Sequence, residues 1–153
     1  TSNYKKTEKL SPKTGDEVFG EEVKKRIMLG THWLGGNGGK NYYEKAKTIK
    51  KLIKQDFDNV FSDYDIILAP TAAATAFDLG AYHDDALSKK HEIDRYTVAA
   101  NLAGIPAISV PCGFHEGLPI GMQLMGKMFD ESTLLRTAKA FEANTDFNTG
   151  PVL

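Results

Sequence analysis

Two charged residues of this sequence, Arg26 and Asp94, are of the types that hold an amino acid by its α-groups. A guanidinium group binds a carboxylate through two parallel hydrogen bonds, and a carboxylate accepts hydrogen bonds from an ammonium group. Arg26 comes directly before the apolar pair Ile27 and Met28, which predicts partial burial. Asp94 lies at or near the start of a predicted helix, where the helix dipole stabilises a carboxylate. The residue pattern alone favours a surface arginine and a helix-capping aspartate, with substrate binding as the alternative.

The glycine-rich segment GGNGGK (residues 35–40) differs from a phosphate-binding loop. That loop needs a glycine five residues before the Gly-Lys pair and Ser or Thr after the lysine. Leu34 and Asn41 occupy these two positions, and no predicted strand precedes the glycines. The segment is therefore interpreted as an interruption of helical structure.

Cys112 is the single cysteine, and it would need a nearby base to act as a nucleophile. His115 is close in sequence, but no orienting carboxylate other than Glu116 is evident, so an inert, buried cysteine is favoured. The histidines show no spacing typical of metal ligands, so no structural or catalytic metal is expected. They are His32, His83, His91 and His115.

The composition is that of one soluble globular domain. The chain has 153 residues, and its formal net charge of −1 gives no reason to expect direct binding to nucleic acid or an anionic membrane. No apolar run approaches the roughly 20 residues that cross a bilayer. Residues 1–19 are polar and lysine-rich, and we interpret them as a linker or disordered arm before a domain over residues 20–153.

Hydrophobic periodicity and the positions of Gly and Pro predict an α/β layered fold. The expected helices are 21–33, 41–62, 93–103 and 131–145, and the expected strands are 66–69, 107–110 and 120–125. The strand 66–69 is expected to be buried on both faces. The last two strands are expected to form an antiparallel hairpin or to be close neighbours, within a mixed sheet. Residues 71–90 are interpreted as a surface connection.

Local signals set the expected ends of these elements. Asn41, with Glu44, resembles a capping box, and Asp130 is a typical N-cap residue. Gly104 is expected to end the third helix. The prolines of the last two strands are expected to mark strand ends, because proline has no amide donor. These are Pro106, Pro111 and Pro119.

The run NLAGIPAISVPCGF…GLPIGMQLMG (residues 101–126) resembles the C-terminal region of the amidase signature family. The segments EEVKKRIMLGT, IKQDFDNVFSDYDIILAPTAAATAF, IDRYTVAANLAG and GKMFDESTLLRTAKAFE are similar to the glutamyl-tRNA(Gln) amidotransferase A subunits within that family. RIMLGT and FDEST discriminate best between family members. The resemblance implies that residues 20–153 are the C-terminal portion of an amidase-signature α/β/α domain with a mixed sheet.

The resemblance also implies a function. Such subunits hydrolyse glutamine and pass ammonia to a partner subunit, which uses ATP and Mg to convert Glu-tRNA(Gln) to Gln-tRNA(Gln). The partners implied are glutamine, the other amidotransferase subunits and, indirectly, tRNA, in the cytoplasm and without a membrane. No cofactor is expected on this chain. The alternatives are a fragment of another amidase-signature hydrolase of small amides, or a non-catalytic scaffold module.

The resemblance assigns roles to two positions. Arg26 matches the residue that binds the glutamine carboxylate, and Asp94 matches the residue that binds its amino group. The family's catalytic residues are a Ser nucleophile, a second Ser on a cis peptide bond and a Lys, carried by a glycine/serine-rich segment. This sequence has no such segment, so we expect no catalytic residue here and no activity from the isolated chain. The segment THWLGGNGGKNYYEKA (residues 31–46) departs from the family pattern.

Overall fold

A computed structural model of the 153-residue chain describes residues 19–35, 37–79 and 94–147. The chain divides into two compact units, residues 1–49 and residues 50–153. The predictions for residues 1–18 and 80–93, which include the arm, part of the surface connection, His83 and His91, lie outside the described residues.

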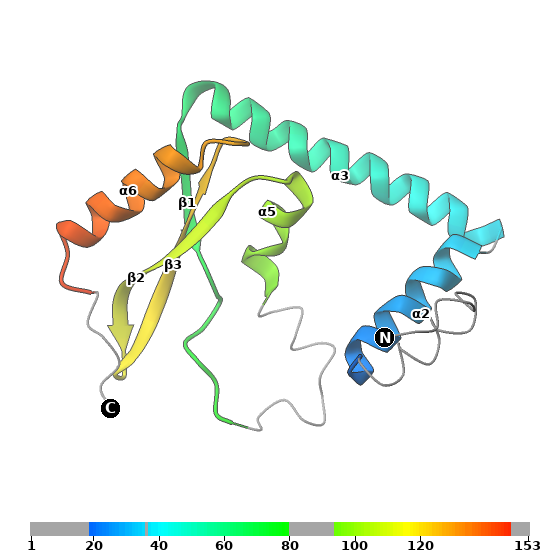
Figure 1. Ribbon diagram of the computed structural model, residues 1–153, viewed down its shortest axis with the longest axis horizontal. Helices are drawn as coiled ribbons and strands as arrows, with labels where there is room; N and C mark the ends of the chain where they lie inside the picture. The colour runs from blue at the N-terminus through cyan, green and yellow to red at the C-terminus, as the bar shows by residue number, and fades with distance from the viewer. Residues whose placement is uncertain (1–18, 36, 80–93, 148–153) are drawn as a thin grey trace, which may run out of the picture. The chain divides into compact units, whose positions relative to one another are not determined.

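The first unit contains α2 (Glu21–Gly35) and the beginning of α3 (Asn37–Asp63), both labelled in Figure 1. The predicted break over residues 35–39 is wrong in extent, because α3 already begins at Asn37. Gly39 allows this, since a Cβ atom there would collide with the backbone of Trp33. The predicted capping box at Asn41 is also wrong, because Asn41 lies within α3.

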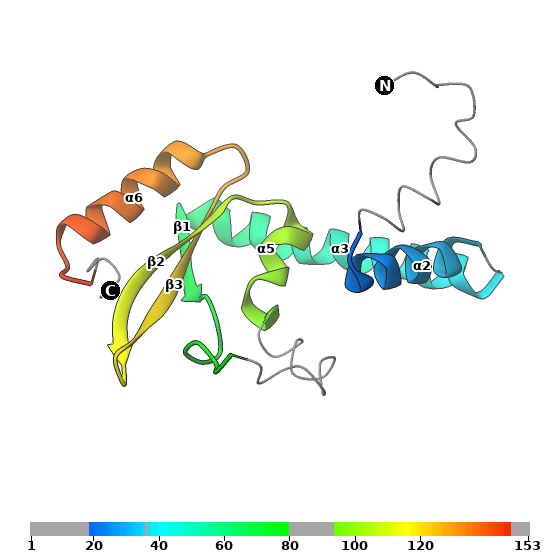
Figure 2. The same ribbon diagram turned by 60° about the horizontal axis from the view of Figure 1, so that its bottom comes forward.

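A three-stranded sheet forms the centre of the second unit (Figures 1 and 2). The strands are β1 (Ile66–Pro70), β2 (Ala107–His115) and β3 (Leu118–Gly126), in the order β1-β3-β2. Glu116 and Gly117, both with positive φ, form the two-residue turn of the β2–β3 hairpin. The hairpin prediction is confirmed. Both pairings are antiparallel, so the described strands do not form the predicted mixed sheet.

The prediction that prolines mark strand ends is wrong for two of them. Pro111 lies inside β2, beside a register shift between Pro111 and Gly113. Because β2 is an edge strand of this sheet and is bulged here, the missing amide donor is tolerated. Pro119 lies in β3 near the turn, and among the described strands β3 has only β2 as a neighbour there, since β1 pairs with Met122–Gly126.

The last helix, α6 (Glu131–Ala143), packs against one face of this sheet. The buried core between them consists of Val110, Met122, Leu124, Leu134 and Ala138. Cys112 is half-buried and packs against this core, so the prediction of a buried cysteine holds only in part.

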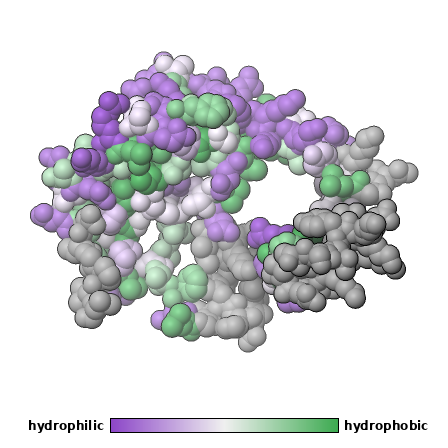
Figure 3. Space-filling view, in the orientation of Figure 1, coloured by the Kyte–Doolittle hydropathy of each residue, from purple (hydrophilic) through white to green (hydrophobic). Residues whose placement is uncertain are grey.

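The strand β1 is not buried on both faces, contrary to the prediction. Leu68 lies opposite Leu124 in the sheet, yet it is 63% exposed whereas Leu124 is 3% exposed. Apolar side chains are visible as green areas of the surface in Figure 3. Those of the second unit that are more than half exposed are Leu52, Tyr64, Leu68, Phe77, Leu79, Phe129 and Leu135.

The predicted helix 93–103 is divided into two shorter elements. The 3-10 helix η1 (Asp94–Tyr96) precedes α5 (Val98–Ala103), and residue 93 is not described. Gly104 adopts the left-handed conformation with φ 71° and ends α5, as predicted. Thr97, not Asp94, occupies the N-cap position of α5, so the interpretation of Asp94 as the cap of this helix is wrong.

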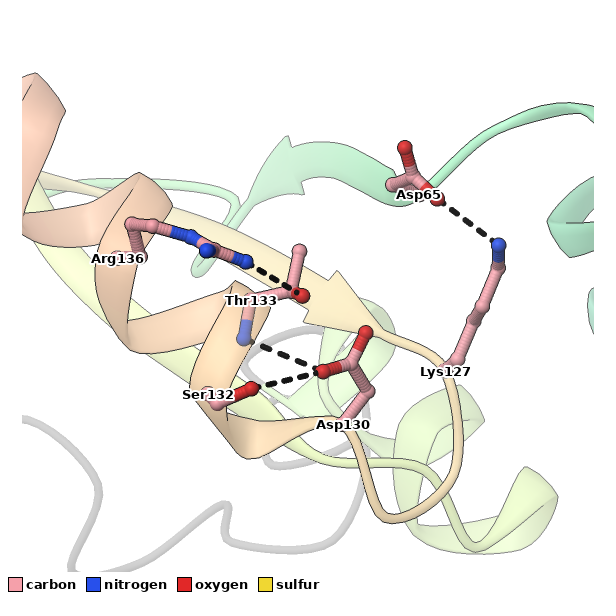
Figure 4. Close-up of polar contacts among 6 residues, drawn as sticks. All are labelled: Asp65, Lys127, Asp130, Ser132, Thr133 and Arg136. Carbon is pink, nitrogen blue, oxygen red and sulfur yellow. Dashed lines mark hydrogen bonds and ion pairs between the residues drawn. The ribbon is translucent and has the colours of Figure 1, made fainter.

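The predicted N-cap of α6 is confirmed. The Asp130 carboxylate accepts hydrogen bonds from Thr133 N at 3.3 Å and from Ser132 Oγ at 3.1 Å (Figure 4). Thr133, through its side chain and its backbone N–H, does most to lower the pKa of Asp130 from its ordinary value of 3.8. Ser132 and the positive charge of Arg136 act in the same direction. The ionised form is therefore the one that the folded state prefers.

We expect Asp130→Ala to lower the melting temperature by a few degrees at neutral pH, because a helix N-terminus loses its cap. Because the folded-state pKa is lowered, the charge of Asp130 stabilises the fold above pH 3.8. This contribution is lost as the pH falls through the folded-state pKa. The difference in melting temperature between the original protein and Asp130→Ala should therefore be larger at about pH 7 than at about pH 3. Thermal unfolding at both pH values measures it. Asp130→Asn, which keeps an acceptor oxygen, is the control. Equal differences in melting temperature between the original protein and Asp130→Ala at both pH values would contradict the prediction.

Candidate binding site and its supporting contacts

Arg26 lies in α2 and is exposed, contrary to the predicted partial burial. Its side chain is 72% exposed, and the neighbouring Ile27 and Met28 are themselves 51% and 66% exposed. Arg26 Nε donates a hydrogen bond to Glu22 Oε1 at 3.2 Å, one helical turn earlier. An exposed pair of this type contributes less than about 1 kcal/mol, so another carboxylate can replace Glu22 at low cost.

Asp94 is the first residue of η1 and is exposed. Its backbone carbonyl accepts hydrogen bonds from Thr97 N at 3.1 Å and Thr97 Oγ1 at 3.2 Å, which close the turn. Within the described part of the chain, the Asp94 carboxylate takes part in no hydrogen bond or ion pair. The structure therefore presents this carboxylate as an available acceptor.

Arg26 belongs to the first compact unit and Asp94 to the second, and each is described within its own unit.

The backbone around Asp94 is attached to the sheet by a buried side chain, Gln123 of β3. Gln123 is 3% exposed, and it is the buried polar residue of the described chain. Its Nε2 donates one hydrogen bond to Tyr96 O at 2.7 Å and another to Pro70 O at 2.9 Å. Both acceptors are carbonyl oxygens, so the amide nitrogen must face them. Gln123 thus joins the last residue of η1 to the end of β1.

A second set of contacts fixes the chain just after β1. Thr71 N donates to Gly121 O at 3.0 Å, and the hydroxyl groups of Thr71 and Ser109 are 2.7 Å apart. A Cβ atom on Gly121 would lie 2.9 Å from Ser109 Oγ and 3.0 Å from Thr71 Oγ1, so glycine leaves room for this pair. We refer to Pro70, Thr71, Tyr96, Ser109 and Gln123 together as the polar junction.

The polar junction and the α6 core use opposite faces of β3. Successive side chains of a strand point to opposite faces, and Met122 and Leu124 belong to the core under α6. Gln123, between them, points to the other face, which Ala69 of β1 and Ser109 of β2 share in register. Gln123 was not predicted from the sequence. The signal was present, because Gln123 is the one strongly polar residue in the apolar strand IGMQLM.

The described residues form neither an activated cysteine nor a metal site. The Cys112 thiol has no hydrogen-bonded base among them, and His115 is exposed at the end of β2. No group of three or more His, Cys, Asp and Glu side chains in the described part of the chain is arranged to hold a metal ion. Among the helices described, none combines the length and apolar character that crossing a membrane requires.

The chain is similar to part of longer proteins. The chain is 49% identical over 148 residues to the A subunit of the glutamyl-tRNA(Gln) amidotransferase of Streptococcus agalactiae, covering 97% of this chain and 30% of the relative. The same subunit of Halalkalibacterium halodurans is 52% identical over 136 residues, which cover 89% of this chain and 28% of that protein. The chain thus spans about 30% of the length of the curated relatives it matches.

Solved structures agree with the sequence relatives. The crystal structure of the A subunit of the glutamyl-tRNA(Gln) amidotransferase of Thermotoga maritima aligns with a TM-score of 0.68 and 41% identity, over 91% of this chain and 30% of that one. A bacterial aryl acylamidase, with a TM-score of 0.62 and 24% identity over 84% of this chain and 27% of that one, shares the fold. A family profile described as Amidase matches residues 1–135. The chain therefore belongs to the amidase signature family, as the run 101–126 predicts.

Proposed function

We propose that this chain is the C-terminal part of a glutamine-hydrolysing amidase subunit that supplies ammonia for the conversion of Glu-tRNA(Gln) to Gln-tRNA(Gln). The observation that carries the proposal is the 49% identity, over 97% of the chain, to the A subunit of a glutamyl-tRNA(Gln) amidotransferase. Other amidases with similar folds are only 21% and 24% identical. This difference favours the amidotransferase over a hydrolase of small amides.

In this proposal, Arg26 binds the α-carboxylate of glutamine in the full-length enzyme. Its guanidinium group can form two parallel hydrogen bonds with a carboxylate. The weak, exposed contact with Glu22 supports this role, because the substrate carboxylate can displace it.

Asp94 binds the α-ammonium group of the same glutamine. Its exposed carboxylate has no protein partner in the described residues, so the substrate supplies the positive charge. Neither Arg26 nor Asp94 attacks the amide carbon. This chain binds the substrate and contributes no nucleophile.

The rest of the reaction takes place on chain segments and subunits outside this one. The Ser and Lys residues of catalysis belong to the remainder of the subunit, and the partner subunit uses ATP and Mg to activate Glu-tRNA(Gln). The tRNA reaches this chain only through the complex, which works in the cytoplasm. The exposed apolar residues of the second unit support burial by other parts of the enzyme, because soluble monomers seldom expose large apolar patches.

The proposal predicts that the isolated 153-residue chain releases no ammonia from glutamine, because the activated nucleophile that acyl transfer requires is absent. The measurement is ammonia release by the isolated chain, beside the full-length subunit in its complex as the active control. Turnover by the isolated chain that Cys112→Ala abolishes would contradict the proposal and make Cys112 the nucleophile.

A further inference from the structure

We infer that Gln123 is a positioning residue for substrate recognition and that it acts by holding the turn that carries Asp94. The inference rests on the proposed function, because it assumes that Asp94 binds the substrate ammonium group. It adds a residue on a different element, with no contact to the substrate, that determines how strongly this enzyme prefers substrates with an α-amino group.

The first step is the attachment of η1 to the sheet. Asp94 lies two residues before Tyr96, within the same short 3-10 helix, and Tyr96 O accepts a 2.7 Å hydrogen bond from Gln123 Nε2. The hydrogen bond from Thr97 N to Asp94 O makes this turn a closed unit, so holding Tyr96 O also holds the Asp94 backbone.

The second step is the rigidity of the attachment point. Gln123 lies in the central strand, paired with Ala69 on one side and Ser109 on the other. Its side chain also donates to Pro70 O at 2.9 Å, so two hydrogen bonds from one buried amide fix its orientation. In the described structure, Gln123 is thus the side chain that bonds the η1 backbone to the sheet.

The third step is energetic. Loss of both Gln123 donors leaves the carbonyl groups of Pro70 and Tyr96 without this partner, and a partly buried acceptor that loses its partner is disfavoured unless water reaches it. The turn can regain hydrogen bonds by moving toward water, which moves Asp94 with it. A displacement of about 1 Å in a recognition group can reduce catalytic efficiency by up to about 100-fold. Loss of the Gln123 donors should therefore weaken binding of the substrate ammonium group by Asp94. It should not slow hydrolysis of the amide bond itself.

The test compares two substrates in the full-length enzyme: glutamine, and glutaramate, which is glutamine without its α-amino group. The quantity measured is the ratio of kcat/KM for glutamine to kcat/KM for glutaramate. Gln123→Met keeps the shape of the side chain and removes both donors, and Asp94→Asn removes the proposed partner of the ammonium group. The control, Thr137→Val, removes a 2.9 Å side-chain hydrogen bond within α6, on the other face of the sheet.

We expect Asp94→Asn to abolish most of the preference for glutamine, and Gln123→Met to reduce it about tenfold while kcat for glutaramate stays near its original value. Thr137→Val should leave the ratio unchanged. If Asp94→Asn lowers the ratio and Gln123→Met does not, the inference is wrong and the proposed function stands. If Asp94→Asn leaves the ratio unchanged, the role of Asp94 in the proposed function is wrong, and the inference fails with it.

A purely structural role of Gln123 gives a different result. It would lower kcat/KM for both substrates equally, leave the ratio unchanged and overturn the inference. If Gln123→Met does not fold, Gln123→Asn replaces it in the same assay. Asparagine keeps the amide but is one methylene too short to reach both carbonyl groups. It must also lower the ratio, and an unchanged ratio overturns the inference.

Discussion

Arg26→Ala is expected to raise the KM of the full-length enzyme for glutamine by about 100-fold, since loss of one partner of a hydrogen-bonded charge pair costs about 3 kcal/mol. Arg26→Lys should give a smaller increase, because lysine keeps the charge but lacks the planar pair of donors. Under the proposed function, amidation of Glu-tRNA(Gln) with an ammonium salt as nitrogen donor should stay normal, because that reaction bypasses the proposed glutamine site. Steady-state kinetics with each nitrogen donor measures both effects.

Lys25→Ala is the matched control for Arg26→Ala. It removes a positive charge from the adjacent position of α2 and leaves Arg26 in place. Lys25→Ala should change the glutamine KM little. An unchanged KM in Arg26→Ala, or an equal increase in both variants, would remove Arg26 from the substrate site.

Leu124→Ala is expected to reduce the free energy of unfolding by about 2–5 kcal/mol, because it opens a cavity in the core between α6 and the sheet. Leu124 is 3% exposed and packs there with Met122 and Leu134. Denaturant unfolding of the 153-residue chain measures this loss. An effect below about 1 kcal/mol would show that the sheet and α6 do not form the core described here.

Leu68→Ala is the control for Leu124→Ala, because the two leucines lie opposite each other on β1 and β3. Leu68 is 63% exposed, so its replacement should cost less than about 1 kcal/mol in the isolated chain. In the full-length subunit the cost should be larger, if other parts of the enzyme cover β1 as proposed. An equal loss of unfolding free energy in the isolated chain and in the full-length subunit would contradict the proposal that other parts of the enzyme cover β1.

The sequence predicted most elements because their signals are local. The N-cap at Asp130, the helix-ending Gly104 and the hairpin between β2 and β3 depend on residues close in sequence. Some of the errors occur where contacts distant in sequence decide the outcome. Pro111 lies inside a strand because β2 is a bulged edge, and the exposure of Leu68 depends on which strands and helices lie beside β1.

The candidate site was predictable only in part. Arg26 and Asp94 were predicted from residue type and family resemblance, and their role in binding stays a prediction. The predicted burial of Arg26 was wrong because burial depends on what packs against α2. The predicted capping role of Asp94 was wrong because the short helix η1 separates Asp94 from α5, which Thr97 precedes. Gln123 was missed because a strand pattern can indicate that a polar residue is buried, but it does not identify the carbonyl groups that accept hydrogen bonds from that residue. The acceptors Pro70 O and Tyr96 O lie 53 and 27 residues away along the chain.

The central claim is that this chain binds the α-carboxylate and α-ammonium groups of glutamine. The most direct test is a crystal structure of the full-length enzyme with bound glutamine. We predict that the Arg26 guanidinium lies about 3 Å from the substrate carboxylate, and the Asp94 carboxylate about 3 Å from the ammonium group. Glutamine bound at the catalytic Ser with both of its α-groups held by other residues would contradict it.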